Sequence, residues 1–176
     1  MKNILRLLKI NYKLSFMKKN PVYSLDSKKI KNENLKIAIL VSLWNKEITN
    51  RLYKGAYNTL IQLGILKDKI KTWEVPGSYE LIYSSKKIAH YYDFDSIIAI
   101  GSLIQGETPH FEYLCQAISH GIKDINIIYD VPVIFCVLSD KNKQQSFDRS
   151  GGKNGNKGIE CAKTAIYMSL FRKSIK

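Results

Sequence analysis

Apolar and polar positions along this chain follow two periods that predict repeated strand–helix units. Four short runs are predicted to be strands, at residues 36–42, 70–75, 96–100 and 131–138. All but 70–75 are mainly apolar, which is typical of buried parallel strands. Stretches with apolar residues three or four positions apart follow the runs and predict helices. These helices end near residues 63, 92 and 128, and a short helix at about 143–149 and a longer one at about 157–171 close the chain.

Strands that alternate with helices through short loops favour a parallel sheet covered on both faces, with right-handed crossovers. The sequence therefore predicts a single α/β domain of three layers around a four-stranded parallel sheet. A sheet this small has edges that need cover from the rest of the chain or from another subunit, so we expect a homo-oligomer.

Length and charge divide the chain into two parts. The 176 residues suffice for one domain and a tail. We predict a basic, partly ordered N-terminal extension over residues 1–34 and the α/β domain over residues 35–176. The formal net charge is +13, and residues 1–34 hold nine Lys and Arg against two acidic residues. The chain has 24 Lys but only 4 Arg, which indicates a compositional bias and not a phosphate-binding face, so we expect no nucleic-acid partner.

Several other protein classes do not fit. Cys115, Cys136 and Cys161 are an odd number of widely spaced thiols, typical of a reducing compartment. Neither a CxxC motif nor ligand-like spacing of histidines is present, so no metal site is expected. The apolar runs are far shorter than the ~20 residues of a membrane span, and Arg6 and Lys9 interrupt any signal-peptide core. We expect a cytoplasmic protein without membrane contact.

The stretch 101–110, GSLIQGETPH, joins the third strand to its helix and carries most of the candidate chemistry. Thr108 suits a helix N-cap, and Pro109 suits the first helical position. Free amides near Glu107 and Thr108, at the positive end of the helix dipole, predict an anion site, best suited to a phosphate. His110 would lie beside that anion as an acid/base near neutral pH. The alternative is an ordinary capped helix start with a surface histidine.

Other distinctive side chains also fall at the carboxyl ends of strands, where open parallel sheets bind ligands. They are Trp44 and Asn45 after the first strand, Tyr79 and Glu80 after the second, and Phe135 in the fourth. Aromatic rings suit stacking on a flat heterocycle, and polar groups suit its edges or a polyol. Trp44 and Phe135 also fit the core. Asn45 also fits a turn, and Glu80 also fits the dipole of a first helical turn.

Arg149 is notable in a chain that otherwise uses lysine. Its rigid fork of donors suits bidentate contact with a phosphate or carboxylate, and the alternative is a surface arginine paired with Asp148 or another acidic residue. The following loop, 151–158, is rich in glycine and lysine but lacks the Gly-Lys-Ser/Thr of a nucleotide-binding loop.

Five segments together resemble the 6,7-dimethyl-8-ribityllumazine synthase family in order and spacing. They are VSLWN at 41–45, VPGSYE at 75–80, the stretch 101–110, VPVIF at 131–135, and DRSGGKNGNKG at 148–158. The resemblance covers about residues 35–173 and is consistent with a flavodoxin-like form of the predicted fold. It implies that a ribitylaminopyrimidinedione condenses with 3,4-dihydroxy-2-butanone 4-phosphate, releasing phosphate and water. It also implies that no metal or organic cofactor is needed.

The resemblance assigns roles to particular residues. His110 would transfer protons, Arg149 would clamp the phosphate, Trp44 would stack on the pyrimidine, and Phe135 would wall the ring pocket from an adjacent subunit. Glu160 matches a supporting polar contact. The full set of substrate contacts that we expect is Trp44, Asn45, Ser78, Tyr79, Glu80, Ser102, Leu103, Ile104, Glu107, Thr108, Phe135 and Lys153.

The resemblance also implies a form of assembly, and other interpretations of the function remain beside it. It implies a pentamer, and the short 149–158 loop resembles members that join twelve pentamers into a 60-subunit shell. Gln105 stands where the family often has Arg or Lys, which predicts weaker phosphate binding. The rival interpretations are a riboflavin- or lumazine-binding protein, a structural compartment, and a nucleic-acid binder that uses residues 1–34. His110 and Arg149 argue against binding alone, since a neutral heterocycle needs neither.

Overall fold

The four predicted strands form one parallel sheet in a computed structural model, which describes residues 30, 31 and 33–175. The strand order is β2-β1-β3-β4, which confirms the predicted α/β class. The elements are β1 (Ile37–Ser42), α3 (Lys46–Gln62), the 3-10 turn η1 (Lys67–Lys69), β2 (Ile70–Val75), α4 (Glu80–Tyr91), β3 (Ser96–Ile104), α5 (His110–Ile128), β4 (Val133–Asp140), α6 (Lys143–Arg149), β5 (Ser150–Gly152), β6 (Gly155–Asn156) and α7 (Lys157–Ser174).

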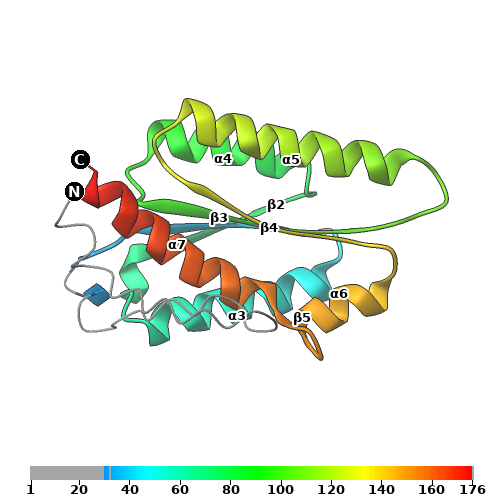
Figure 1. Ribbon diagram of the computed structural model, residues 1–176, viewed down its shortest axis with the longest axis horizontal. Coiled ribbons are helices and arrows are strands. Elements are labelled where there is room, and N and C mark those ends of the chain that lie inside the picture. The colour runs from blue at the N-terminus through cyan, green and yellow to red at the C-terminus, as the bar shows by residue number, and fades with distance from the viewer. Residues whose placement is uncertain (1–29, 32, 176) are drawn as a thin grey trace, which may run out of the picture.

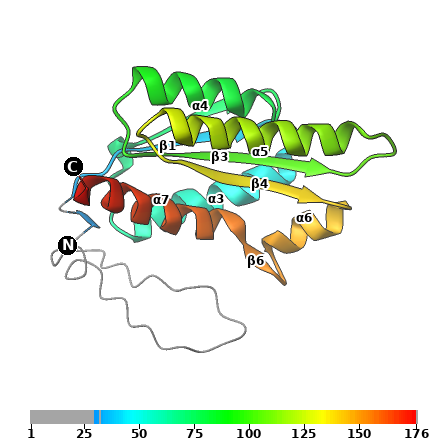
Figure 2. The ribbon, with the colours of Figure 1, turned by 45° about the horizontal axis from the view of Figure 1, so that its top comes forward.

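Helices cover both faces of the sheet, as Figures 1 and 2 show: α4 and α5 lie on one side and α3 and α7 on the other. Successive side chains of a strand point to opposite faces. In β1, Ile37 and Ile39 belong to the core beneath α3 and α7, whereas Ala38 and Leu40 belong to the core beneath α4 and α5. Both faces are buried, so the sequence of β1 is a continuous apolar run.

The third strand is longer than the sequence predicts. It covers 96–104 instead of 96–100, because its pairing with β4 continues as far as Ile104 opposite Asp140. Gly101 therefore lies inside the strand and not in the turn. A Cβ at Gly101 would meet the Ser78 hydroxyl oxygen at 2.6 Å, so the close approach of the β2–α4 turn requires glycine there.

The fourth strand is displaced by two residues, from the predicted 131–138 to 133–140. Pro132 lacks an N–H to donate to a ladder, although its carbonyl accepts a hydrogen bond from the Ile97 amide at 2.9 Å. The predicted loop at 151–158 is instead a short antiparallel hairpin, β5–β6, which leads directly into α7.

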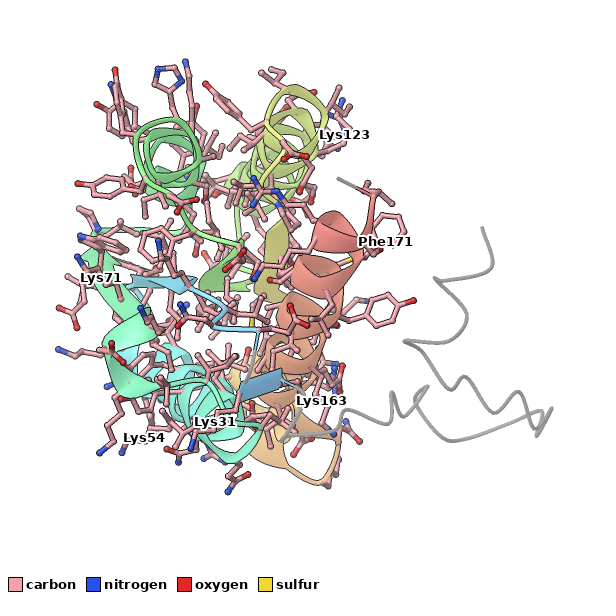
Figure 3. All side chains as sticks on the ribbon, turned by 90° about the vertical axis from the view of Figure 1, so that its left-hand side faces the viewer. Lys31, Lys54, Lys71, Lys123, Lys163 and Phe171 are labelled. Carbon is pink, nitrogen blue, oxygen red and sulfur yellow. The ribbon has the colours of Figure 1, made fainter. Side chains whose placement is uncertain are left out.

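The expected extension, residues 1–34, lies for the most part outside the described residues. Of the residues that can be described, Ile30 is buried in the core beneath α3 and α7, and Lys31 is exposed. In Figure 3 the labelled lysines are spread over the view: Lys54 and Lys71 lie toward one side, Lys123 lies near the top, and Lys31 and Lys163 lie in the lower part. Those side chains do not form a single basic face.

Helices α3 and α7 pack so closely that Gly158 has no room for a side chain. A Cβ there would lie 2.0 Å from the Leu52 carbonyl oxygen. We expect Gly158→Ala to force the helices apart and to lower the free energy of unfolding by about 1–3 kcal/mol, as overpacking typically does. Urea denaturation measures this loss. Gly106→Ala is the matched control, because a Cβ at Gly106 meets nothing within 4 Å; equal stability of the two variants would contradict the prediction.

Candidate active site

The turn after β1 is tied to the turn after β2. The amide of Leu43 donates to the Val75 carbonyl at 2.8 Å, and the amide of Trp44 donates to the Pro76 carbonyl at 3.2 Å. The Trp44 side chain is 71% exposed, so its alternative interpretation as a core residue is wrong. An indole held on a fixed backbone and open to solvent can stack on a planar ligand.

Asn45 connects β1 to β3. It has left-handed backbone angles, φ 57 and ψ 43, and precedes α3, which agrees with its turn-forming interpretation because asparagine tolerates this region. Its Nδ2 also donates to the Ser102 carbonyl at 2.9 Å. The Ser102 and Leu103 side chains are buried and Ile104 is half-buried, so a ligand above this strand end meets backbone and Ile104.

The β2–α4 turn places one buried and two exposed polar groups next to this edge. Ser78 is buried, and its hydroxyl has no hydrogen-bond partner among the described residues. Tyr79 is 53% exposed. Glu80 begins α4, and its carboxylate folds back so closely that a Cβ at Gly77 would lie 2.7 Å from Oε2. A first-turn carboxylate also complements the helix dipole, so the structural interpretation of Glu80 fits and leaves its ligand role open.

The loop before α5 is exposed from Gln105 to His110. The Gln105 amide donates to the Asp140 carbonyl at 2.9 Å, which fixes the start of the loop against the end of β4. Helix α5 begins at His110, Pro109 occupies the capping position, and no side chain caps the helix. The prediction of Thr108 as N-cap is therefore wrong by one residue: the fixed φ of Pro109 already starts the turn. The first-turn amides still lack intrahelical acceptors, as an anion site requires.

Arg149 is paired with Glu160, which agrees with the alternative interpretation of an arginine paired with an acidic residue, although the partner is not Asp148. Its Nη1 and Nη2 donate to the two carboxylate oxygens at 2.9 and 3.1 Å, and Nη1 also donates to the Asn154 carbonyl at 2.6 Å. A guanidinium has five N–H donors. Within the described part of the chain these bonds leave the Nε–H and one Nη2–H, which share an edge suited to a phosphate.

The ion pair between Arg149 and Glu160 shifts the pKa values of both side chains. The hydrogen bond from Arg149 lowers the pKa of the Glu160 carboxyl, and the same bond raises the pKa of the Arg149 guanidinium. A depressed carboxyl pKa means that the pair stabilises the fold above the ordinary carboxyl range, and that this stabilisation is lost as the pH falls through the lowered pKa. The pair is thus intact at neutral pH.

Lys153 lies at the tip of the hairpin and forms an ion pair with Asp148. Its Nζ is 3.1 Å from Asp148 Oδ2, and the lysine side chain is 74% exposed. A hydrogen bond from Gln144, followed by the contact with Lys153, lowers the pKa of Asp148. The position of Lys153 near Arg149 agrees with the expected polar role but does not test it.

Within one chain, the residues expected to form the site come from different parts of the fold. Trp44, Ser78 and Glu80 belong to turns that are joined at the ends of β1 and β2. Arg149 lies on the hairpin side of the sheet, with α3 and α7, whereas α5 lies on the opposite face (Figure 2). Phe135 lies in the edge strand β4 and is half-buried against the core beneath α4 and α5, which fits its core interpretation in an isolated chain.

A groove lies elsewhere among the described residues, between α4 and α5. It has a volume of about 700 Å³ and is lined by Tyr79, Glu80, Ile82, Tyr83, Lys86, Gly121, Asp124, Ile125, Ile128 and Tyr129. Only Tyr79 and Glu80 of the expected site reach it. Helix α5 also exposes three large hydrophobic side chains among its polar ones: Tyr113 in its first turn, and Ile127 and Ile128 at its end, each at least 69% exposed. Ile128 lines the groove, and exposed apolar side chains beside a groove are typical of a contact with another protein.

The described residues offer neither a metal site nor a membrane-spanning helix. Among the described residues, no group of three or more His, Cys, Asp or Glu side chains could hold a metal ion. In the same part of the chain, no helix is both long enough and apolar enough to cross a membrane.

This arrangement is that of an α/β protein whose exposed aromatic, carboxylate and imidazole groups gather beyond the carboxyl ends of parallel strands, the usual place for small-molecule ligands. Residues 34–173 match the model of the 6,7-dimethyl-8-ribityllumazine synthase family, and the chain belongs to that family.

Relatives described as 6,7-dimethyl-8-ribityllumazine synthase include one from Christiangramia forsetii, 50% identical over 145 residues that make up 82% of this chain and 86% of the relative. A second, from Flavobacterium johnsoniae, is 50% identical over 140 residues, covering 80% of this chain and 74% of the relative. A third, from Parabacteroides distasonis, is 44% identical over 137 residues, covering 78% and 86%.

Proposed function

We propose that this chain is the enzyme that condenses 5-amino-6-(D-ribitylamino)uracil with 3,4-dihydroxy-2-butanone 4-phosphate to form 6,7-dimethyl-8-ribityllumazine, with release of phosphate and water. The observation that carries this proposal is the family match over residues 34–173, which include nearly all of the described chain. The enzyme acts in the cytoplasm on small molecules, without a metal or organic cofactor, and binds neither nucleic acid nor membrane.

The aromatic and polar groups at the ends of β1, β2 and β3 bind the pyrimidine and its ribityl chain. The exposed Trp44 ring stacks on the heterocycle, while Tyr79 and Glu80 contact its polar edge and the polyol. Asn45, Ser78, Ser102, Leu103 and Ile104 shape the floor of this pocket, with Ser78 offering a buried hydroxyl that lacks a partner among the described residues.

The loop before α5 binds the phosphate and holds the acid/base. Backbone amides near Glu107 and Thr108, at the positive end of α5, face the phosphate. His110, exposed at the first position of α5, moves protons as the amine condenses with the ketone and the phosphate leaves. Arg149 clamps the phosphate through its free Nε–Nη2 edge, with Lys153 in support.

Arg149 and Phe135 reach this site from an adjacent subunit. Their elements support this: Arg149 ends α6, which packs on the face of the sheet opposite α5, and Phe135 lies in the edge strand β4. The exposed Tyr113, Ile127 and Ile128 of α5 are side chains that a neighbour would cover. The assembly is a pentamer, and twelve pentamers form a 60-subunit shell. Sedimentation velocity measures the particle size: a monomer would overturn the shared site, and a particle of pentamer size would overturn only the shell.

The reaction is tested by mixing purified protein with both substrates and following lumazine fluorescence. The two substrates also react slowly without enzyme, so the rate in its absence is subtracted. A rate well above this background supports the synthase. A rate equal to background would contradict it and favour a protein that binds the lumazine without making it.

A shared site makes a further prediction for mixed assemblies. Assemblies made only of His110→Ala or only of Arg149→Ala subunits are expected to keep a small fraction of the activity, but together the two variants form some sites with both residues intact. With random mixing in a closed ring we expect about a quarter of the sites to be restored. Co-expression of the two variants and assay of the mixed particles measures this, and mixed particles no more active than either parent would place both residues in one subunit's site.

Gln105 predicts a specific weakness in phosphate binding. Its side chain is exposed beside the phosphate loop and carries no charge. We expect Gln105→Arg to lower KM for the butanone phosphate severalfold, since a charge pair at an exposed position is worth up to about 1 kcal/mol, and to leave KM for the pyrimidine unchanged. Steady-state kinetics with each substrate varied in turn measure both constants. An unchanged KM for the phosphate substrate would contradict the prediction that the uncharged Gln105 weakens phosphate binding.

A further inference from the structure

The hairpin that follows Arg149 is held by a single carboxamide. Asn156, the last residue of β6, donates from Nδ2 to the Ser150 carbonyl at 2.9 Å and to the Arg51 carbonyl at 3.1 Å. Its Oδ1 accepts from the Gly158 amide at 2.8 Å and caps α7. One side chain therefore joins the hairpin, helix α3 and the start of α7.

Helix α3 has room for the Asn156 carboxamide because residue 55 is a glycine. A Cβ at Gly55 would lie 2.6 Å from Asn156 Oδ1, so Asn156 can approach the helix only because Gly55 has no side chain. Arg51, one turn earlier, donates from Nε to the Ser150 carbonyl at 3.2 Å, and its guanidinium lies over the Phe147 ring at 4.9 Å from the centroid. The Ser150 carbonyl thus accepts from two side chains.

These contacts fix the two members of the Arg149–Glu160 pair relative to each other. Ser150 directly follows Arg149, so holding its carbonyl fixes the backbone from which the guanidinium extends. Glu160 lies in the first turn of α7, the turn that Asn156 caps. Asn156 therefore fixes both the backbone that carries the Arg149 side chain and the first turn of α7, which carries Glu160.

We propose that Asn156, assisted by Arg51, is a positioning residue for phosphate binding: it orients the Arg149–Glu160 pair so that the Nε–Nη2 edge of the guanidinium faces the phosphate. This inference rests on the proposed role of Arg149. Asn156 itself makes no contact with substrate, because all three of its hydrogen bonds are internal to the hairpin and the two helices.

The test is Asn156→Asp. Aspartate has the same size and caps a helix as well as asparagine, so the Gly158 contact survives. Both Nδ2 donations are lost, and a carboxylate oxygen faces two carbonyl oxygens instead. We expect KM for the butanone phosphate to rise about tenfold, as two lost hydrogen bonds imply, while KM for the pyrimidine changes less than twofold. The inhibition constant of inorganic phosphate is expected to rise in parallel.

Asn142→Asp is the matched control. Asn142 also caps a helix through Oδ1, accepting from the Gln145 amide at 3.0 Å, and no Nδ2 donation accompanies that cap among the described contacts. We expect its kinetic constants to stay at wild-type values. A merely structural role of Asn156 would lower the melting temperature and the active fraction, but would not separate the two KM values.

Arg149→Ala is measured in parallel, so that two failures can be told apart. If Arg149→Ala raises KM for the butanone phosphate and Asn156→Asp does not, the positioning role is wrong while the proposed function stands. If neither variant raises it, both the positioning role and the role of Arg149 are wrong. If Asn156→Asp does not fold, Arg51→Met replaces it: this variant keeps an unbranched side chain, loses the Nε donor and the guanidinium over Phe147, and is expected to raise the same KM about threefold. An unchanged KM there would overturn the proposal.

Discussion

Arg149→Ala is expected to lower kcat/KM for 3,4-dihydroxy-2-butanone 4-phosphate roughly 100-fold, since a hydrogen bond to a charged group contributes about 1.5–3 kcal/mol and each 1.4 kcal/mol is tenfold. The reason is the geometry of the pair with Glu160. The carboxylate holds Nη1 and one hydrogen of Nη2 at 2.9 and 3.1 Å, so the guanidinium is oriented before the phosphate arrives and two parallel donors remain. Steady-state kinetics with the pyrimidine saturating measure the loss.

Two further arginine variants show whether the loss comes from phosphate binding. Arg149→Lys keeps the charge but not the fork, so we expect an intermediate loss. Arg172→Ala removes a comparable ion pair, with Asp130 at 2.8 Å, near the other end of α7, and its KM values are expected to stay unchanged. If Arg149→Ala leaves KM for the phosphate substrate unchanged, the guanidinium serves the fold and not the ligand.

Most of the fold follows from local pattern. The first two strands lie where the sequence predicts them. For β1 the reason is that both faces are buried, so its apolar pattern is continuous. The third strand was predicted too short because Gly101 and Ser102 resemble a turn in isolation. Pairing with β4 continues the ladder to Ile104, and this tertiary pairing outweighs the weak strand preference of those two residues.

The site follows from sequence only where its geometry is local. The turns that expose Trp44 and start α5 at His110 depend on a few adjacent residues, and they were predicted to within one position. The sequence does not predict the hydrogen bonds that hold the backbone next to Arg149, because they join residues far apart in the chain. The bond from Arg51 to Ser150 joins residues 99 positions apart, and the bond from Asn156 to Arg51 joins residues 105 positions apart. The Asn-x-Gly pattern at the start of α7 is a capping signal and could have identified Asn156 alone.

His110→Ala is expected to lower kcat about 100- to 1000-fold, within the usual range for a lost general acid or base, with little change in either KM. The imidazole is exposed at the start of α5, so its removal costs the fold little; exposed substitutions usually change stability by less than about 0.5 kcal/mol. His120→Ala is the matched control, since His120 is another exposed histidine of α5 and should leave kcat unaltered.

Chemical rescue separates proton transfer from any other use of this side chain. If His110 moves a proton as phosphate leaves, free imidazole diffusing into the space left by alanine should restore part of the lost rate, because it supplies the same acid/base group without the covalent link. Rescue has to saturate with imidazole and be absent in Arg149→Ala, whose defect is in binding. A low rate in His110→Ala that imidazole does not raise would assign His110 to the shape of the phosphate loop, and an unaffected rate would remove it from the mechanism.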